Sequence, residues 1–177
     1  ALPNDIKQIF EKFAPCSVTE GYGLSETAPI ATANPVGEEP RKLNDKINTI
    51  GLPVPNTIIE IVDEDDSSNI MPIGERGEIA ISGPQVMQGY WARPEATEEC
   101  LQNGRFLTGD VGVMDEDGFT YIVDRKKDII VTNNGFNVYP RELEEVLLTH
   151  PAVTLAAVIG VPDEEHGEEI KAFVVLK

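Results

Sequence analysis

The sequence predicts a mixed α/β protein in which an antiparallel, β-barrel-like subdomain is followed by a smaller, partial α+β domain. Three observations predict this fold class. Residues 51–123 alternate short β-branched runs with turn signals, residues 129–177 follow a strand–helix–strand order, and a dense charge run at residues 124–128 separates the two. We therefore expect a domain boundary at residues 124–128.

The composition of the 177-residue chain fits a globular protein, because 41% of the residues are apolar. The formal net charge of −17 disfavours nucleic acid as a partner, since phosphate contacts need a basic surface. No apolar run reaches the roughly 18 residues that a membrane-spanning helix needs. Cys16 and Cys100 lack zinc-site spacing and fit a reducing compartment. We expect a cytoplasmic protein without a transmembrane segment.

The two ends of the sequence lead us to expect a piece of a longer enzyme. The chain begins at Ala1 without a methionine, and it stops at Lys177 inside the apolar run 170–176, which is predicted to be a strand. Missing sheet neighbours would leave apolar surface and strand edges exposed, and a homodimer is one way to cover them.

The first part of the chain is expected to form a helix, a strand and two loops. Apolar side chains recur at helical spacing over residues 3–14. This stripe consists of Ile6, Ile9, Phe10 and Phe13. Residues 17–22 predict a strand that leads into a glycine-bearing loop, and the polar segment 32–49 predicts a surface loop.

The remaining chain alternates strands with two helices. Helices are predicted at residues 94–102 and 140–149, each opened by a proline. A hairpin turn is predicted at 115–118 because Asp-Glu-Asp-Gly lies between two apolar runs. Strands are predicted at residues 57–62, 77–82, 111–114, 119–123, 129–132, 152–160 and 170–176.

The loop Gly21–Thr27 is the first stretch that could carry chemistry. Its two glycines let the backbone approach a flat ligand, while Tyr22 offers a stacking face. Glu26 could hold Mg²⁺, which prefers oxygen ligands, and the hydroxyl of Thr27 could donate to a phosphate. The alternative is a plain strand-to-helix turn in which Ser25 or Thr27 caps the helix.

Asp110 and Arg125 mark two more candidate stretches. A carboxylate at a strand edge, such as Asp110 after Gly109, can accept two hydrogen bonds from a ribose diol. The guanidinium of Arg125 suits phosphate or sugar oxygens. The simpler interpretations are an Asx-turn at Asp110 and a solvated interdomain linker at residues 124–128.

Two other stretches favour structural explanations. The Asn-Gly signal within residues 132–140 fits an ordinary connection from a strand to a helix. Tyr90 and Trp91, beside Arg93, are expected to be packing and cation–π partners.

The order and spacing of these stretches closely resemble the adenylate-forming superfamily, and within it the acyl-CoA synthetases of the long-chain fatty-acid–CoA ligase type. The resemblance covers essentially the whole chain. It rests on the segments Tyr22–Thr27, Gly77–Gly83 with Gly89–Thr97, Thr108–Asp110, Asp124–Asp128 and Asn137–Glu144.

The resemblance implies a two-step reaction. A carboxylic acid, expected to be a fatty acid, and ATP give an acyl-adenylate and pyrophosphate, and the thiol of coenzyme A then displaces AMP. ATP, Mg²⁺ and coenzyme A are the implied cofactors and co-substrates, and the parent enzyme would be cytoplasmic or peripheral to the membrane. An aryl- or amino-acid-activating domain that loads a carrier protein and a non-catalytic nucleotide-binding module are the alternatives.

Matched positions imply roles in the glycine-bearing loop. Tyr22 would stack on adenine, with Gly21 and Gly23 in the pocket wall. Thr27 would bond the α-phosphate, and Glu26 would help to hold Mg²⁺.

Matched positions later in the chain also imply roles. Asp110 would hold the ribose hydroxyls, Ile122 would pack against the nucleoside, and Arg125 would contact the ribose. Lys127 matches the hinge about which the small C-terminal domain rotates between the half-reactions. The loop of Asn133, Asn134 and Gly135 would line the pantetheine tunnel for coenzyme A.

The resemblance also divides the chain. Residues 1–123 would end the large nucleotide-binding domain, with its β-barrel-like subdomain at about 48–123, residues 124–128 would be the hinge, and residues 129–177 an incomplete lid. The family's Ser/Thr/Gly-rich phosphate loop and its C-terminal lysine have no match here. The loss of such electrostatic groups costs several kcal/mol of barrier each, so we expect the chain alone to be inactive.

Overall fold

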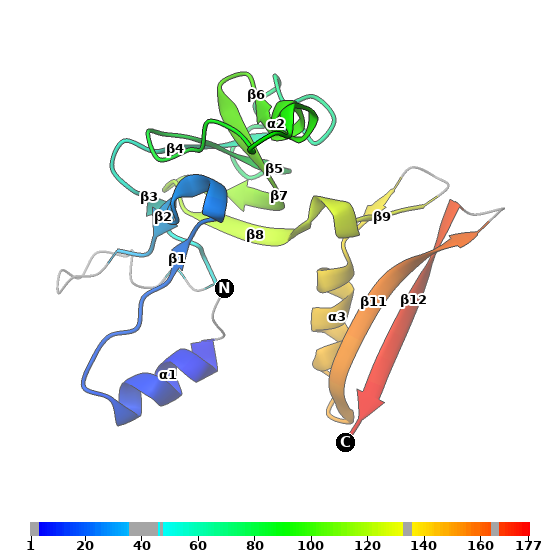
Figure 1. The fold of residues 1–177 in the computed structure, drawn as a ribbon. Helices are drawn as coiled ribbons and strands as arrows, with labels where there is room; N and C mark the ends of the chain where they lie inside the picture. Colours follow the sequence, from blue (N-terminus) through cyan, green and yellow to red (C-terminus); the bar gives the residue numbers. More distant parts are fainter. Residues whose placement is uncertain (1–3, 36–45, 47, 133–135, 164–166) are drawn as a thin grey trace. The chain divides into compact units, whose positions relative to one another are not determined.

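The computed structural model describes residues 4–35, 46, 48–132, 136–163 and 167–177, and it confirms the mixed α/β class with mostly antiparallel sheets (Figure 1). The chain divides into two compact units. The first comprises Ala1–Thr108 and Gly112–Ile122, and the second comprises Gly109–Val111 and Val123–Lys177.

Short elements dominate the chain as far as the 124–128 charge run. The helical elements are α1 (Asn4–Phe13), the 3₁₀ helix η1 (Ser25–Thr27) and α2 (Pro94–Cys100). The strands are β1 (Gly21–Tyr22), β2 (Thr32–Ala33), β3 (Leu52–Pro53), β4 (Ile58–Val62), β5 (Arg76–Ser82), β6 (Leu101–Gln102), β7 (Arg105–Met114) and β8 (Thr120–Arg125).

The main sheet runs in the order β4-β5-β7-β6, and β8 pairs with β7 (Figure 1). In the antiparallel register of β4 and β5, Ile59 lies opposite Ile81 and Ile61 opposite Ile79, so strand alternation places all four on one face. These side chains build the core of the first unit together with Ala31, Ile50 and Phe106. A small sheet of β1, β2 and β3 accompanies it.

The predicted hairpin between β7 and β8 is confirmed, and hydrogen bonds to the Asp115 carboxylate stabilise its turn. The Asp115 carboxylate accepts the N–H groups of Asp117 and Phe119 at 3.0 and 2.9 Å, and Lys46 Nζ lies 2.6 Å from its other oxygen. Burial opposes ionisation of this carboxyl, but Lys46 and the two amides outweigh burial and lower the pKa of Asp115.

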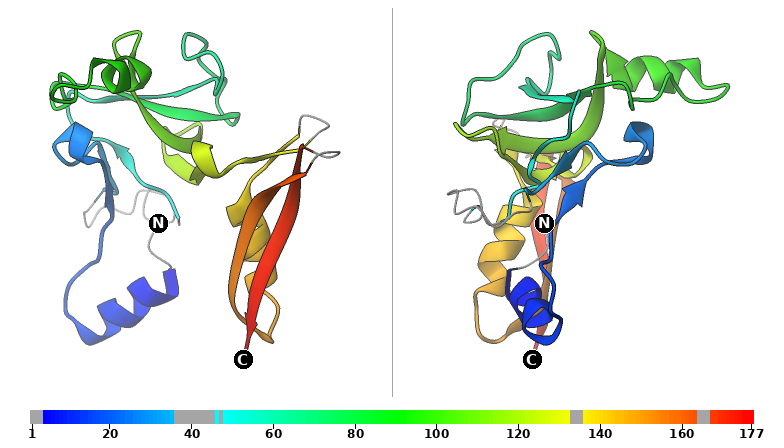
Figure 2. Two further views of the ribbon diagram at one scale, coloured as in Figure 1. Left: turned by 45° about the vertical axis from the view of Figure 1, so that its right-hand side comes forward. Right: turned by 90° about the vertical axis from the view of Figure 1, so that its left-hand side faces the viewer.

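The second unit is a helix packed on a long hairpin. Its elements are the 3₁₀ helix η3 (Lys126–Asp128), β9 (Ile130–Val131), β10 (Asn137–Val138), α3 (Pro140–Leu148), β11 (Val153–Asp163) and β12 (Gly167–Leu176). Figure 2 shows α3 lying along the β11–β12 hairpin, which it contacts through β11. Among the residues described, the buried apolar side chains of this unit are Val111, Ile130, Tyr139 and Val158.

Asp124 ties β8 to the start of α3 within this unit. One oxygen of its buried carboxylate accepts the N–H of Arg125 at 2.8 Å, and the other accepts the N–H of Arg141 at 3.0 Å. Arg141 lies in the first turn of α3, where backbone N–H groups have no partner inside the helix and a negative charge is favoured.

Several element boundaries differ from the sequence predictions. The predicted helix 94–102 ends at Cys100, because Asn103 and Gly104, with φ of 53° and 76°, form the tight turn of a hairpin that pairs β6 with β7. The predicted strand 17–22 forms only as Gly21–Tyr22. Within the predicted surface loop 32–49, Thr32 and Thr49 are fully buried, and their hydroxyls donate to the carbonyls of Ile50 and Thr120, which removes the penalty of burying them.

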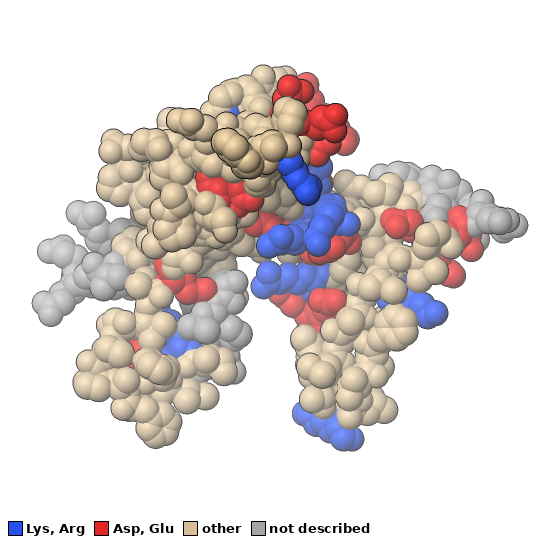
Figure 3. All heavy atoms as spheres, in the orientation of Figure 1, with Lys and Arg blue, Asp and Glu red and all other residues tan. Residues whose placement is uncertain are grey.

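The expected exposed apolar surface is present in both units. The apolar stripe of α1 is open, with Phe13 84% exposed, and apolar side chains of the β11–β12 hairpin such as Leu155 and Phe173 are also exposed. Among the described residues, no helix combines the length and apolar character needed to cross a membrane. On the face drawn in Figure 3, acidic side chains occur in several separate groups.

Candidate functional site

The glycine-bearing loop begins at the edge of the first core. Tyr22 in β1 is half-buried and packs against the core cluster, opposite Thr32 of β2. At Gly23 the chain passes so close to the backbone of Pro29 that a Cβ would overlap the Pro29 carbonyl oxygen. The glycine is therefore required by close packing of the loop on itself.

Thr27 holds the loop together from inside. It is fully buried, and its Oγ1 accepts the N–H of Leu24 at 2.9 Å and donates to the Leu24 carbonyl at 3.0 Å. These bonds resemble the capping role that was the simpler interpretation of the loop. In this geometry the hydroxyl shapes the turn that presents Glu26.

Glu26 is held by a second segment of the same unit. Tyr90, 64 residues later in the chain, donates its hydroxyl to Glu26 Oε1 at 2.6 Å, and the Met87 N–H donates to the Glu26 carbonyl at 2.8 Å. The hydrogen bond to the carboxylate, aided by burial, raises the pKa of Tyr90 to about 12. The phenol therefore remains a protonated donor at neutral pH.

The Glu26 carboxylate can contribute one ligand to Mg²⁺. No group of three or more His, Cys, Asp or Glu side chains that could hold a metal occurs in the described part of the chain. Mg²⁺ commonly binds one or two protein carboxylates together with substrate phosphates and water. Glu26 fits that shared coordination, in which substrate and water supply the other ligands.

Asp110 and Arg125 come together in the second unit. The Arg125 Nε lies 2.8 Å from Asp110 Oδ1, and the carboxylate is almost fully buried while the Arg125 side chain is 57% exposed. Gly109, immediately before, has a φ of 73°, a conformation that favours glycine. The pair joins a fixed negative acceptor to a more accessible positive donor.

Asp110 lies inside β7 rather than at a strand edge, which corrects the prediction. Phe106, Thr108 and Asp110 alternate as buried positions along the strand. A polar strand interior is tolerated because the Thr108 hydroxyl donates to the Ile79 carbonyl at 2.8 Å and Arg125 pairs with Asp110.

The remaining predicted residues occupy separate positions. Ile122 in β8 is partly buried and packs against the first core, and Lys127 is exposed in η3. Asn133, Asn134 and Gly135, predicted to line the tunnel for coenzyme A, lie outside the described residues.

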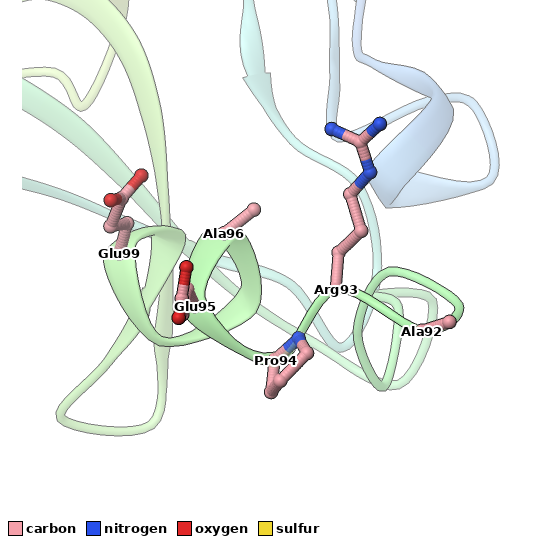
Figure 4. A pocket seen from close by; sticks show the side chains of 6 residues that line it. All are labelled: Ala92, Arg93, Pro94, Glu95, Ala96 and Glu99. Carbon is pink, nitrogen blue, oxygen red and sulfur yellow. The ribbon is translucent and has the colours of Figure 1, made fainter.

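Two open hollows flank α2. One of about 480 Å³ is lined by Ala92, Arg93, Pro94, Glu95, Ala96 and Glu99. In Figure 4 the Arg93 side chain extends away from Glu95 and Glu99, so the hollow has unlike charges on different sides. The other, of about 430 Å³, includes Tyr90 and Trp91. None of the loop or ribose residues predicted from the sequence lines these two hollows.

The expected packing role of Trp91 is wrong, because this residue is 96% exposed. Its neighbour Tyr90 donates a hydrogen bond to Glu26, a role that the sequence analysis does not predict. No local signal in the sequence could have revealed this bond, since the two residues lie far apart in the chain.

Comparisons with known proteins decide the family. The profile described as AMP-binding enzyme matches residues 1–91, and the profile described as AMP-binding enzyme C-terminal domain matches residues 142–177. The chain belongs to the AMP-binding enzyme family. This membership confirms the resemblance to adenylate-forming enzymes that the order of the sequence motifs predicts.

Individual relatives in this family extend over the whole chain. The long-chain-fatty-acid–CoA ligase of Bacillus subtilis (strain 168) is 49% identical over 177 residues, which is 100% of this chain and 30% of that protein. ATP-bound MatB from Rhodopseudomonas palustris is 35% identical with a TM-score of 0.84, covering 99% of this chain and 34% of that one.

A third relative is o-succinylbenzoate CoA synthetase (MenE) from Bacillus subtilis, in complex with the acyl-adenylate intermediate OSB-AMP. It is 38% identical with a TM-score of 0.75, over 90% of this chain and 31% of that one. The chain thus spans about a third of the length of each of these relatives.

Proposed function

We propose that this chain carries nucleotide-binding residues and part of the C-terminal domain of an AMP-forming fatty-acid–CoA ligase. The observation that carries the proposal is the Asp110–Arg125 pair, in which a buried carboxylate is held 2.8 Å from an accessible guanidinium. A carboxylate fixed before the ligand arrives can accept hydrogen bonds from a sugar diol at a small entropic cost. Family membership supports AMP as the ligand.

Each candidate residue has a distinct part in the proposal. Tyr22 stacks on adenine, Asp110 and Arg125 hold the ribose, and Ile122 packs against the nucleoside. Gly21 and Gly23 belong to the wall of the proposed pocket, and Gly23 also lets the loop pack closely on the backbone of Pro29. Thr27 acts first by shaping the loop, because its hydroxyl is already engaged with Leu24.

The proposed reaction has two steps that balance without any further reactant. The carboxylate of the acid attacks the α-phosphorus of ATP, and pyrophosphate leaves. The sulfur of coenzyme A then attacks the acyl carbonyl, and AMP leaves. Mg²⁺ would supply charge neutralisation at the phosphate oxygens, with Glu26 as its protein ligand.

The C-terminal domain serves the second step in this proposal. Lys127 is the hinge, and the coenzyme A contacts predicted for Asn133, Asn134 and Gly135, which lie outside the described residues, remain predictions from the sequence. A fatty acid as the substrate is supported by the relative from Bacillus subtilis, which is named for long-chain fatty acids. The cytoplasmic location and the homodimer stay predictions from the sequence.

Calorimetric titration of the chain with AMP tests the proposed binding site. We expect AMP to bind, and 2′-deoxy-AMP to bind about tenfold more weakly, because a hydrogen bond to a charged group contributes about 1.5–3 kcal/mol. Equal affinities for the two nucleotides would contradict the ribose contact. No heat of binding with AMP would contradict the nucleotide site as a whole.

Turnover is expected only when the chain is joined to the rest of a ligase. The chain alone, incubated with ATP, palmitate and coenzyme A, should release no AMP, since the chain spans only 30% of its Bacillus subtilis relative. A hybrid in which this chain replaces the matching part of that ligase should form palmitoyl-CoA. AMP release by the chain alone, or a folded hybrid that activates no fatty acid, would overturn this expectation.

A further inference from the structure

Tyr90 belongs to a segment that holds Glu26 from two directions. Its hydroxyl donates to Glu26 Oε1 at 2.6 Å, and the N–H of nearby Met87 donates to the Glu26 carbonyl at 2.8 Å. Both the main chain and the side chain of Glu26 are therefore fixed by residues that lie more than sixty positions later in the sequence.

The segment that carries Tyr90 is itself fixed at the start of α2. The Tyr90 N–H donates to Thr97 Oγ1 at 2.9 Å, and that hydroxyl donates to the Arg93 carbonyl at 2.8 Å. Gly89 has a φ of 144°, and a Cβ at this position would collide with the Thr97 side chain. These contacts fix the backbone position of Tyr90 relative to α2.

One oxygen of the Glu26 carboxylate stays open. Oε1 accepts the Tyr90 hydroxyl, whereas Oε2 has no hydrogen bond or ion pair to any residue that the structure describes. A carboxylate anchored through one oxygen with the other open has the form of a metal ligand whose orientation is set by a neighbour.

We propose that Tyr90 is a positioning residue, whose hydroxyl orients Glu26 so that Oε2 is ready to bind the Mg²⁺ that accompanies ATP. This inference rests on the proposed function. Because the carboxylate is already oriented, less side-chain freedom is lost when the magnesium–nucleotide complex binds.

The test compares Tyr90→Phe with a matched control, Tyr121→Phe. Tyr121 also donates its hydroxyl to a carboxylate, that of Asp115 at 3.2 Å, but far from Glu26 in the sequence and on the β7–β8 hairpin. The affinity of the chain for ATP is measured by calorimetry with and without MgCl₂, and thermal unfolding of each variant confirms that it folds. The ratio of the two affinities is the gain due to Mg²⁺.

We expect Tyr90→Phe to reduce this gain about tenfold, the size of effect found when a residue that orients a metal ligand is removed, and to leave magnesium-free ATP affinity unchanged. Tyr121→Phe should keep the full gain. An unchanged gain in Tyr90→Phe, or an equal loss with and without Mg²⁺, would overturn the positioning role while the nucleotide site stands. Failure of the unmodified chain to bind ATP would instead overturn the proposed function, and the positioning role with it.

Discussion

Replacing Asp110 with asparagine is expected to lower the affinity of the chain for AMP by about 10- to 100-fold. The buried carboxylate offers two acceptor oxygens, whereas asparagine offers one acceptor and adds a donor that points at the same ligand atoms. The substitution also removes the charge that orders Arg125, whose Nε lies 2.8 Å away. Hydrogen bonds to charged groups contribute about 1.5–3 kcal/mol each, which sets the expected range.

The matched control for this prediction is Glu60→Gln. Glu60 is likewise a carboxylate paired with an arginine, since Arg105 Nε lies 2.6 Å from its Oε2, but it is assigned no ligand. AMP binding by calorimetry should be unaffected in Glu60→Gln, and both variants should keep the far-ultraviolet circular dichroism of the parent chain. Unaltered AMP affinity in a folded Asp110→Asn variant would refute the ribose role.

Replacing Gly23 with alanine is expected to destabilise the first unit by about 3 kcal/mol, the upper part of the range for overpacking a tight site. The added Cβ would overlap the Pro29 carbonyl oxygen and press on the backbone of Ile30. Because these are main-chain atoms, no side-chain rotation can relieve the overlap. The loop would have to move away from the position in which Thr27 and Glu26 are now held.

Chemical denaturation of Gly23→Ala beside Gly21→Ala measures this effect. At Gly21 an added Cβ meets the Thr32 carbonyl oxygen at 3.4 Å, an ordinary van der Waals distance, so that variant should stay within about 1 kcal/mol of the parent in stability. Similar unfolding midpoints for the two variants would show that the loop adapts to the extra methyl group.

Much of the fold could be predicted because local pattern and final packing agree. The strand at Ile58–Val62 follows a run rich in β-branched residues, the strand at Arg76–Ser82 contains the alternating pair Ile79 and Ile81, and α3 begins at the predicted Pro140. Element boundaries were wrong where one sequence signal is compatible with two local structures. Asn103-Gly104 fits the end of the predicted helix 94–102, but it also suits a two-residue hairpin turn, and only the pairing of β6 with β7 selects the turn.

The candidate site was predictable by residue type but not by partner. The sequence predicts a ribose contact for Asp110 and a phosphate or sugar contact for Arg125, yet the pairing of the two depends on tertiary structure that no local pattern encodes. Tyr90 was missed as a donor for the same reason, since its partner Glu26 is 64 residues away. Thr27 shows the opposite case, because its bonds to Leu24 lie within three residues, although Thr27 ends η1 and bonds back to the residue before that helix instead of capping the start of a helix.

Asp124 sets a condition on any pivoting at Lys127. Its two carboxylate oxygens bind amides on either side of that lysine, Arg125 just before it and Arg141 well after it. A single side chain, that of Asp124, thus anchors the segment containing Lys127 at both of its ends, Arg125 and Arg141. Rotation of α3 about Lys127 would first have to break the hydrogen bond from the Arg141 N–H to Asp124. Asp124 would therefore control how readily that rotation begins.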